Sequence, residues 1–147
     1  MKVGLTYDLK DEYVPQPDDP PDAATELDSE ETISALEAAI RANGHKTVRI
    51  GNARNLLALA MDDDLEVDLV FNISEGLEGR SREAQVPAIL DLLGIPYTGS
   101  DALTMALSLD KGMSKKVFRS ERVPTPDWFV APSAAEVDQW ELEFPLF

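Results

Sequence analysis

Strand-like and helix-like runs alternate along the first hundred residues, and this alternation restricts the fold more than any other feature of the sequence. Each run of β-branched and apolar residues is followed by a polar connection and then a segment with helical signals. The run Val67–Ile73 is almost continuously apolar, as a strand buried on both faces requires. Short connections between alternating elements predict a parallel, right-handed α/β sheet. The predicted strands are Lys2–Tyr7, Thr47–Ile50, Val67–Ile73 and a short one ending in Tyr97–Ser100; the predicted helices run from a cap at Asp28–Ser29 to Asn43, over Leu56–Ala60, and from Ala88 to Leu93.

Composition excludes several classes of protein. The chain has 147 residues, of which 44% are hydrophobic, so it is long enough for one core or for one domain and part of another. No apolar run approaches the roughly 20 residues that span a bilayer, and we expect a cytoplasmic protein without a membrane partner. The absence of cysteine excludes disulfides and thiolate sites, and His45 is the single histidine, in a turn before a strand. A net charge of −15 argues against a nucleic-acid partner.

The negative charge is concentrated after the first predicted strand. Ten acidic residues and one lysine lie between Asp8 and Glu31, together with four prolines. Carboxylates and prolines at this density disfavour regular structure, so Asp8 to about Glu26 is predicted to form a long loop. Two interpretations remain open for it, a solvated mobile loop and a lid or specificity loop.

The pattern changes after Ser100. One helix is predicted from a cap at Ser100–Asp101 to Leu107, and a second from Asp110 to a point before Pro124. Pro124 and Pro126 then predict an extended link. Further predicted elements are a strand at Trp128–Val130, a helix at Ser133–Trp140 and a strand beginning at Phe144–Phe147. Because an unpaired apolar strand at a chain end is an aggregation hazard, we expect the sequence to be a fragment of a longer protein.

One helix in this acidic chain is cationic. Lys111, Lys115, Arg119 and Arg122 recur at a spacing that places them in one stripe of the helix predicted from Asp110. Such a stripe is either a solvated face that pairs with the acidic loop or a site for a phosphate-bearing ligand. Arg80 and Arg82 add two cations after the third strand, either as ordinary surface charge or as part of a site.

The loop after the third strand is a candidate site, because open α/β sheets bind ligands at the carboxyl ends of their strands. Its sequence Gly76-Leu77-Glu78-Gly79 contains two glycines, and the chain has neither a P-loop nor a dinucleotide-binding G-x-G-x-x-G. A Ser-His-Asp arrangement is also absent, since His45 lies at the wrong end of its strand.

Three motifs identify a resemblance. Leu92-Leu93-Gly94-Ile95-Pro96-Tyr97-Thr98-Gly99-Ser100, then Ala106-Leu107-Ser108-Leu109-Asp110-Lys111, then Val123-Pro124-Thr125-Pro126 occur in the order and at the spacing of the D-alanine–D-alanine ligase family of the ATP-grasp superfamily. The resemblance is specific from Leu92 to Pro126 and weak before Tyr13. It implies a Rossmann-like pre-ATP-grasp domain over residues 1–98, and linker helices with the start of an ATP-grasp domain over residues 99–147.

The resemblance also implies a function. Family members use ATP to convert a carboxylate into an acyl phosphate, which the amine of a second substrate attacks. Lys111 would contact the nucleotide phosphates, and Glu75, Gly76, Tyr97 and Ser100 would contact the amino-acid substrate. ATP and Mg²⁺ are the implied cofactors, with the magnesium ligands beyond Phe147, so this fragment alone should be inactive. A homodimer and a role in cell-wall peptidoglycan synthesis are further implications.

Two departures from the family pattern bear on the substrate. Glu75-Gly76 stands where the family usually has His-Gly, and the acidic insert from Asp8 stands where it usually has Glu-His-x-Val-Ser. The amino-acid substrate is therefore left open. The alternative interpretation, from another class of protein, is a non-catalytic receiver-like or flavodoxin-like binding module.

Overall fold

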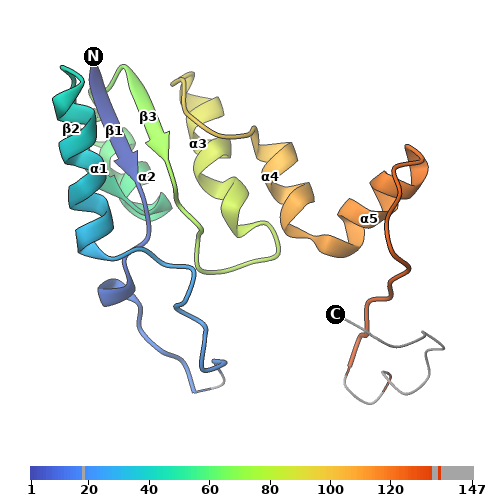
Figure 1. Cartoon of the computed structure of the whole chain (residues 1–147). Coiled ribbons are helices and arrows are strands. Elements are labelled where there is room, and N and C mark those ends of the chain that lie inside the picture. The colour runs from blue at the N-terminus through green and yellow to red at the C-terminus, as the bar shows by residue number, and fades with distance from the viewer. Residues whose placement is uncertain (18, 134–135, 137–147) are drawn as a thin grey trace. The chain divides into compact units, whose positions relative to one another are not determined.

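The computed structural model describes residues 1–17, 19–133 and 136. It divides into two compact units, Met1–Ala106 and Leu107–Phe147. The first contains a three-stranded parallel sheet in the order β2-β1-β3, formed by β1 (Lys2–Thr6), β2 (Lys46–Gly51) and β3 (Leu69–Asn72) (Figure 1). The predicted parallel α/β sheet is confirmed.

The predicted fourth strand is reduced to a single bridge. Tyr97 pairs with Val70 of β3 in parallel, and the backbone of Val70 accepts from Thr98 and donates to Pro96 at 2.9 Å each. Two hydrogen bonds do not extend into a ladder, so this segment is a bridge beside β3 and not a strand.

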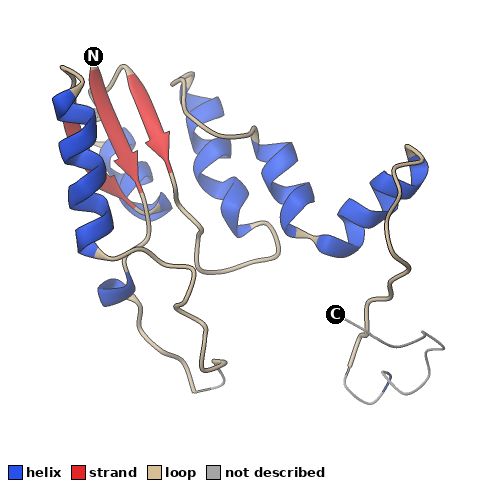
Figure 2. Ribbon diagram, in the orientation of Figure 1, coloured by secondary structure: helices blue, strands red, loops and turns tan. Residues whose placement is uncertain are grey.

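Helices cover both faces of the sheet (Figure 2). On one face, α1 (Glu30–Ala42) begins at the Ser29 cap and packs Ile33 against Leu5 and Tyr7 of the first strand and its continuation. On the other, α2 (Ala53–Met61) and α3 (Gln85–Leu93) enclose the larger core cluster. Side chains alternate across a strand, which is why Val70 and Phe71, neighbours in β3, belong to different clusters. The larger cluster consists of Ile50, Leu56, Val70, Val86 and Leu90.

The second unit was predicted less well. The boundary between the units falls within α4 (Ala102–Leu109), and α5 (Lys111–Ser120) follows it. Asp101 and Asp110 accept from backbone N–H groups three residues on, as N-caps do. Residues 123–131 form neither helix nor strand, so the strand predicted at Trp128–Val130 is wrong. The elements predicted at Ser133–Trp140 and Phe144–Phe147 lie almost wholly outside the described residues.

Among the described residues, every helix is too short or too polar to cross a membrane.

Candidate functional site

The strand order points to the carboxyl ends of β1 and β3. The chain passes from β1 to β2 on one side of the sheet and later to β3 on the other side of β1. In open α/β sheets the connections leaving two such strands diverge, and ligands bind in the resulting crevice. The segments that leave this edge are the acidic loop after β1 and the loop after β3, both drawn below the strands in Figure 1.

A buried carboxylate organises this edge. Asp8, 5% exposed, accepts a hydrogen bond from the Ser74 hydroxyl and another, of 2.9 Å, from the Gly76 N–H. Asn72 at the end of β3 accepts from the Thr6 hydroxyl at 2.8 Å. The sequence analysis placed Asp8 in the acidic insert and missed this role. The signal available was its position directly after a buried strand.

Gly76 is required by the backbone of the loop. Its φ is +68°, and a Cβ atom there would lie 2.6 Å from the carbonyl oxygen of Arg82. A side chain is therefore disfavoured by the left-handed backbone conformation and also by the lack of space beside Arg82. This candidate acts by letting the loop close on itself and by aiming its N–H at Asp8.

Glu75 is a carboxylate that holds its proton more tightly than usual. It is half-buried, and burial raises its pKa, with further increases from the nearby charges of Glu83 and Glu26. The guanidinium of Arg82 opposes this by lowering the pKa. A positively charged group placed beside Glu75 would favour its ionised form, so this side chain suits recognition of an amine.

Arg82 connects the two loops of the edge. Its guanidinium forms an ion pair with Glu26 of the acidic loop and lies 3.9 Å from Glu83. The base of the acidic loop is closed by two backbone hydrogen bonds of 2.9 Å, from Asp28 to Asp8 and from Lys10 to Asp28. Arg82 is thus more than ordinary surface charge, and its side chain is only 21% exposed.

Tyr97 and Ser100 are placed differently from each other. The Tyr97 hydroxyl donates to Asp91 of α3 at 2.9 Å, and burial with this hydrogen bond raises its pKa to about 12. The phenol hydroxyl of Tyr97 is therefore hydrogen-bonded to α3. Ser100 is exposed, two residues beyond Thr98, whose hydroxyl accepts from the Asn72 N–H at 3.1 Å. Ser100 follows a segment that is fixed to the carboxyl end of β3.

In the second unit, the predicted nucleotide-contacting residue is accessible. Lys111 is exposed at the first position of α5, and its amine donates to the Ser108 carbonyl at 3.2 Å. The predicted stripe is shorter than expected, because α5 ends at Ser120 and Arg122 lies in the following turn with φ +59°. Lys115 and Arg119 bond to residues 125–127 of the following segment.

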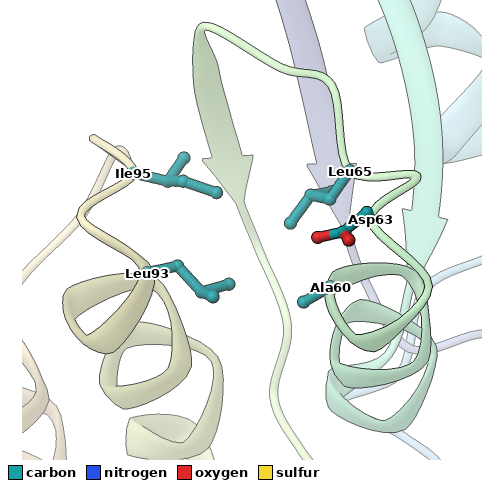
Figure 3. A pocket seen from close by; sticks show the side chains of 5 residues that line it. All are labelled: Ala60, Asp63, Leu65, Leu93 and Ile95. Atoms are coloured by element: carbon teal, nitrogen blue, oxygen red, sulfur yellow. The ribbon is translucent and has the colours of Figure 1, made fainter.

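A hollow on the first unit lies away from this edge. It is lined by Ala60, Asp63, Leu65, Leu93 and Ile95, at the carboxyl ends of α2 and α3 (Figure 3). In a parallel α/β unit the helices end near the amino ends of the strands, so this hollow lies at the opposite edge of the sheet. None of the candidate residues lines it.

Within the residues that the structure describes, no three His, Asp or Glu side chains are grouped so that they could hold a metal ion.

Comparison with known proteins gives similar sequences and a similar structure, although no protein-family model matches. An uncharacterised protein, y4sG, of Sinorhizobium fredii is 34% identical over 119 residues, which are 76% of this chain and 35% of that protein. A D-alanine–D-alanine ligase of Moorella thermoacetica is 37% identical over 103 residues, which are 70% of this chain and 32% of the ligase. The chain thus spans about a third of the length of these curated relatives.

One similar solved structure is a D-alanine–D-alanine ligase of Bacillus anthracis in complex with ATP. It is 25% identical, with a TM-score of 0.57, and the match covers 95% of this chain and 44% of the ligase. The α/β fold with its parallel sheet is shared with that ligase.

Proposed function

Starting from the homology of this chain to the N-terminal region of D-alanine–D-alanine ligases, we propose that it is the N-terminal part of an ATP-dependent carboxylate–amine ligase. The observation that carries the proposal is the match of nearly the whole chain to a ligase solved with ATP. In such a reaction ATP phosphorylates a substrate carboxylate, and an amine displaces the phosphate to form a peptide-type bond. The chain's substrates are then an amino acid and ATP, in a cytoplasmic protein.

The two units take different parts in this proposal. The carboxyl edge of the sheet binds the amino acid, with Glu75 beside its amine, Gly76 shaping the loop, and Ser100 at the rim. Tyr97 positions the segment that leads to Ser100. The raised pKa of Glu75 supports its part, because burial, and after it the charges of Glu83 and Glu26, disfavour the ionised form that an adjacent ammonium group would favour.

Lys111 binds a phosphate of ATP in this proposal. Its amine is exposed at the first turn of α5, where backbone N–H groups also favour an anion, and it makes one hydrogen bond of moderate length. Mg²⁺ would supply charge neutralisation on the phosphates, and we assign none of the described residues to it because they contain no metal-binding group of three.

The test is ATP-dependent phosphate release by the full-length protein, measured over a panel of D- and L-amino acids. Lys111→Ala should lose about 10-fold in kcat/KM, the scale of one charge-assisted hydrogen bond of roughly 1.5–3 kcal/mol, with little change in melting temperature. Lys116→Ala is the matched control, since this lysine is exposed on the same helix, and it should stay within about two-fold. Lys115 and Arg119 are unsuitable controls, because both hold the segment after α5.

Equal losses in both variants would show that α5 acts only as a diffuse positive field. Phosphate release that no amino acid stimulates would contradict the assignment as a ligase.

A further inference from the structure

The segment that follows α5 folds back along the helix. Val123 donates to the Phe118 carbonyl at 2.8 Å near the end of α5. Further along, the Lys115 amine donates to the Thr125 hydroxyl at 3.0 Å, in the middle of the helix. Val130, further along still, lies against Gly112 in the first turn of the helix, so the segment and the helix run antiparallel (Figure 1).

Trp128 is held by two cations of α5. The guanidinium carbon of Arg119 lies 4.5 Å from the centre of the indole ring, and the Lys115 amine lies 5.8 Å from it. Arg119 also donates to the Asp127 carboxylate at 2.8 Å. Cations at such distances are attracted to the negative face of the indole ring. We name Lys115, Arg119 and Trp128 the indole clamp.

Gly112 shows where the segment meets the start of the helix. Gly112 is the second residue of α5, in the same turn as Lys111. A Cβ atom at Gly112 would lie 2.8 Å from a methyl carbon of Val130. The absence of a side chain therefore lets Val130 lie against the turn that carries Lys111.

We propose that the indole clamp positions the segment from Thr125 to Val130 against α5 so that its Val130 end lies beside Lys111. Lys115, Arg119 and Trp128 are then positioning residues for nucleotide binding, and not phosphate ligands. The inference rests on the proposed role of Lys111 in the ligase reaction. Two independent observations carry it, the contacts of the clamp and the close approach at Gly112.

Fluorescence in the full-length protein measures the clamp without reference to activity. The chain contains two tryptophans, Trp128 and Trp140, so Trp140→Phe isolates the signal of Trp128 within it, and any tryptophan beyond this sequence is replaced likewise. Lys115→Met should make Trp128 more accessible to acrylamide quenching and should shift its emission maximum to longer wavelength. Lys115→Arg, which keeps a donor and a cation, should restore both toward the parent values.

The KM for ATP then measures whether the clamp positions the segment beside Lys111. Lys115→Met and Trp128→Leu should each raise KM for ATP about ten-fold, because small misplacements of a binding group have effects of that order or more. Gly112→Ala changes no charge and should also raise this KM. Gly112→Ala/Val130→Ala, which removes the opposing methyl group, should recover it.

The outcomes separate the inference from the proposed function. If Lys115→Met raises KM while Trp128→Leu and Gly112→Ala do not, Lys115 binds phosphate directly and the inference is wrong. If Lys115→Met makes Trp128 more accessible but leaves KM for ATP unchanged, the clamp has no part in nucleotide binding. If Lys111→Ala has no effect on KM, the proposed role of Lys111 fails, and the inference fails with it.

Discussion

At the scale of single residues, two carboxylates at the same edge of the sheet differ in their surroundings. Asp8 is buried and accepts two hydrogen bonds from the loop after β3. Glu75 is half-buried, and burial raises its pKa, as do the charges of Glu83 and Glu26 to a smaller extent. Asp8 therefore builds the edge, and Glu75 is the group whose charge a ligand can change.

The first residue-scale prediction concerns Glu75. Its folded pKa is raised above the usual value of about 4.3, so the folded protein binds this proton more tightly than the unfolded chain. Its ionisation therefore lowers the free energy of unfolding as the pH rises from about 4.3 through the raised pKa. Glu75→Gln should stabilise the protein at pH 7.5 and show no such gain near pH 3.5, as measured by thermal unfolding.

Glu78→Gln is the control, since this glutamate is exposed three residues along the same loop. It should change the free energy of unfolding by less than about 0.5 kcal/mol. A gain in Glu75→Gln that is the same at both pH values would contradict the electrostatic explanation.

The second residue-scale prediction separates strain from close contact. Gly76 and Gly94 have φ values of +68° and +67°, but only Gly76 lies against backbone, the carbonyl of Arg82. Gly94→Ala should cost about 1 kcal/mol from its left-handed conformation alone. Gly76→Ala should cost more, up to about 3 kcal/mol, because the loop must also move. Urea unfolding of both variants measures the difference, and equal costs would mean that the loop adapts freely.

At the scale of elements, an ion-pair network joins α1 to β2. Arg49 of β2 donates to Glu37 at 2.7 Å and to Glu30 at 2.6 Å, both on α1. Thr47 donates to the same Glu37 at 2.9 Å. Burial tends to raise the pKa of Glu37, but the hydrogen bonds from Arg49 and Thr47 and the charge of Arg49 outweigh this, and the pKa is lowered.

At the scale of elements, we predict the effect of replacing Arg49, the centre of this network. Arg49→Met leaves Oε2 of Glu37, whose side chain is 10% exposed, without the Arg49 donor, while Arg41 and Thr47 still donate to Oε1, and should cost about 1–3 kcal/mol at pH 7. Because the folded pKa of Glu37 is lowered, the stabilisation exists above the usual glutamate pKa and is lost as the pH falls through the folded value. The cost should therefore shrink below about pH 4, measured by denaturant unfolding.

Arg54→Met is its control, since Arg54 is exposed at the start of α2, and we expect a change within about 0.5 kcal/mol. A pH-independent loss in Arg49→Met would mean that the arginine contributes by packing its aliphatic stem and not through Glu37.

At the scale of the whole molecule, the prediction is that the 147-residue chain alone binds ATP weakly. Lys111 offers a single exposed charge, and one such contact is worth roughly 1 kcal/mol or less. Calorimetric titration with ATP should therefore detect no micromolar binding by this chain, whereas the full-length protein should bind ATP if the proposed function holds. Micromolar affinity of the chain would show that residues 1–147 already contain a complete nucleotide site.

The sequence by itself determined the parallel sheet, the helix starts at Ser29, Asp101 and Asp110, and the homology to ligases. These are set by local signals, namely strand-forming runs, capping side chains and short motifs, which act over a few residues. The sequence also predicted that the acidic segment from Asp8 to about Glu26 would form a long loop, and among its described residues the 3-10 turn Lys10–Glu12 is the one regular helix or strand.

Only the tertiary structure decided how polar groups distant in sequence are paired. It brings Asp8 to Ser74 and Arg82 to Glu26, residues separated by more than fifty positions, and no local pattern encodes such contacts. The aromatic run at Trp128–Val130 predicted a strand. The structure instead holds that run along α5 by the side chains of Lys115 and Arg119, because cation–π and side-chain hydrogen bonds replace the backbone ladder that a strand needs.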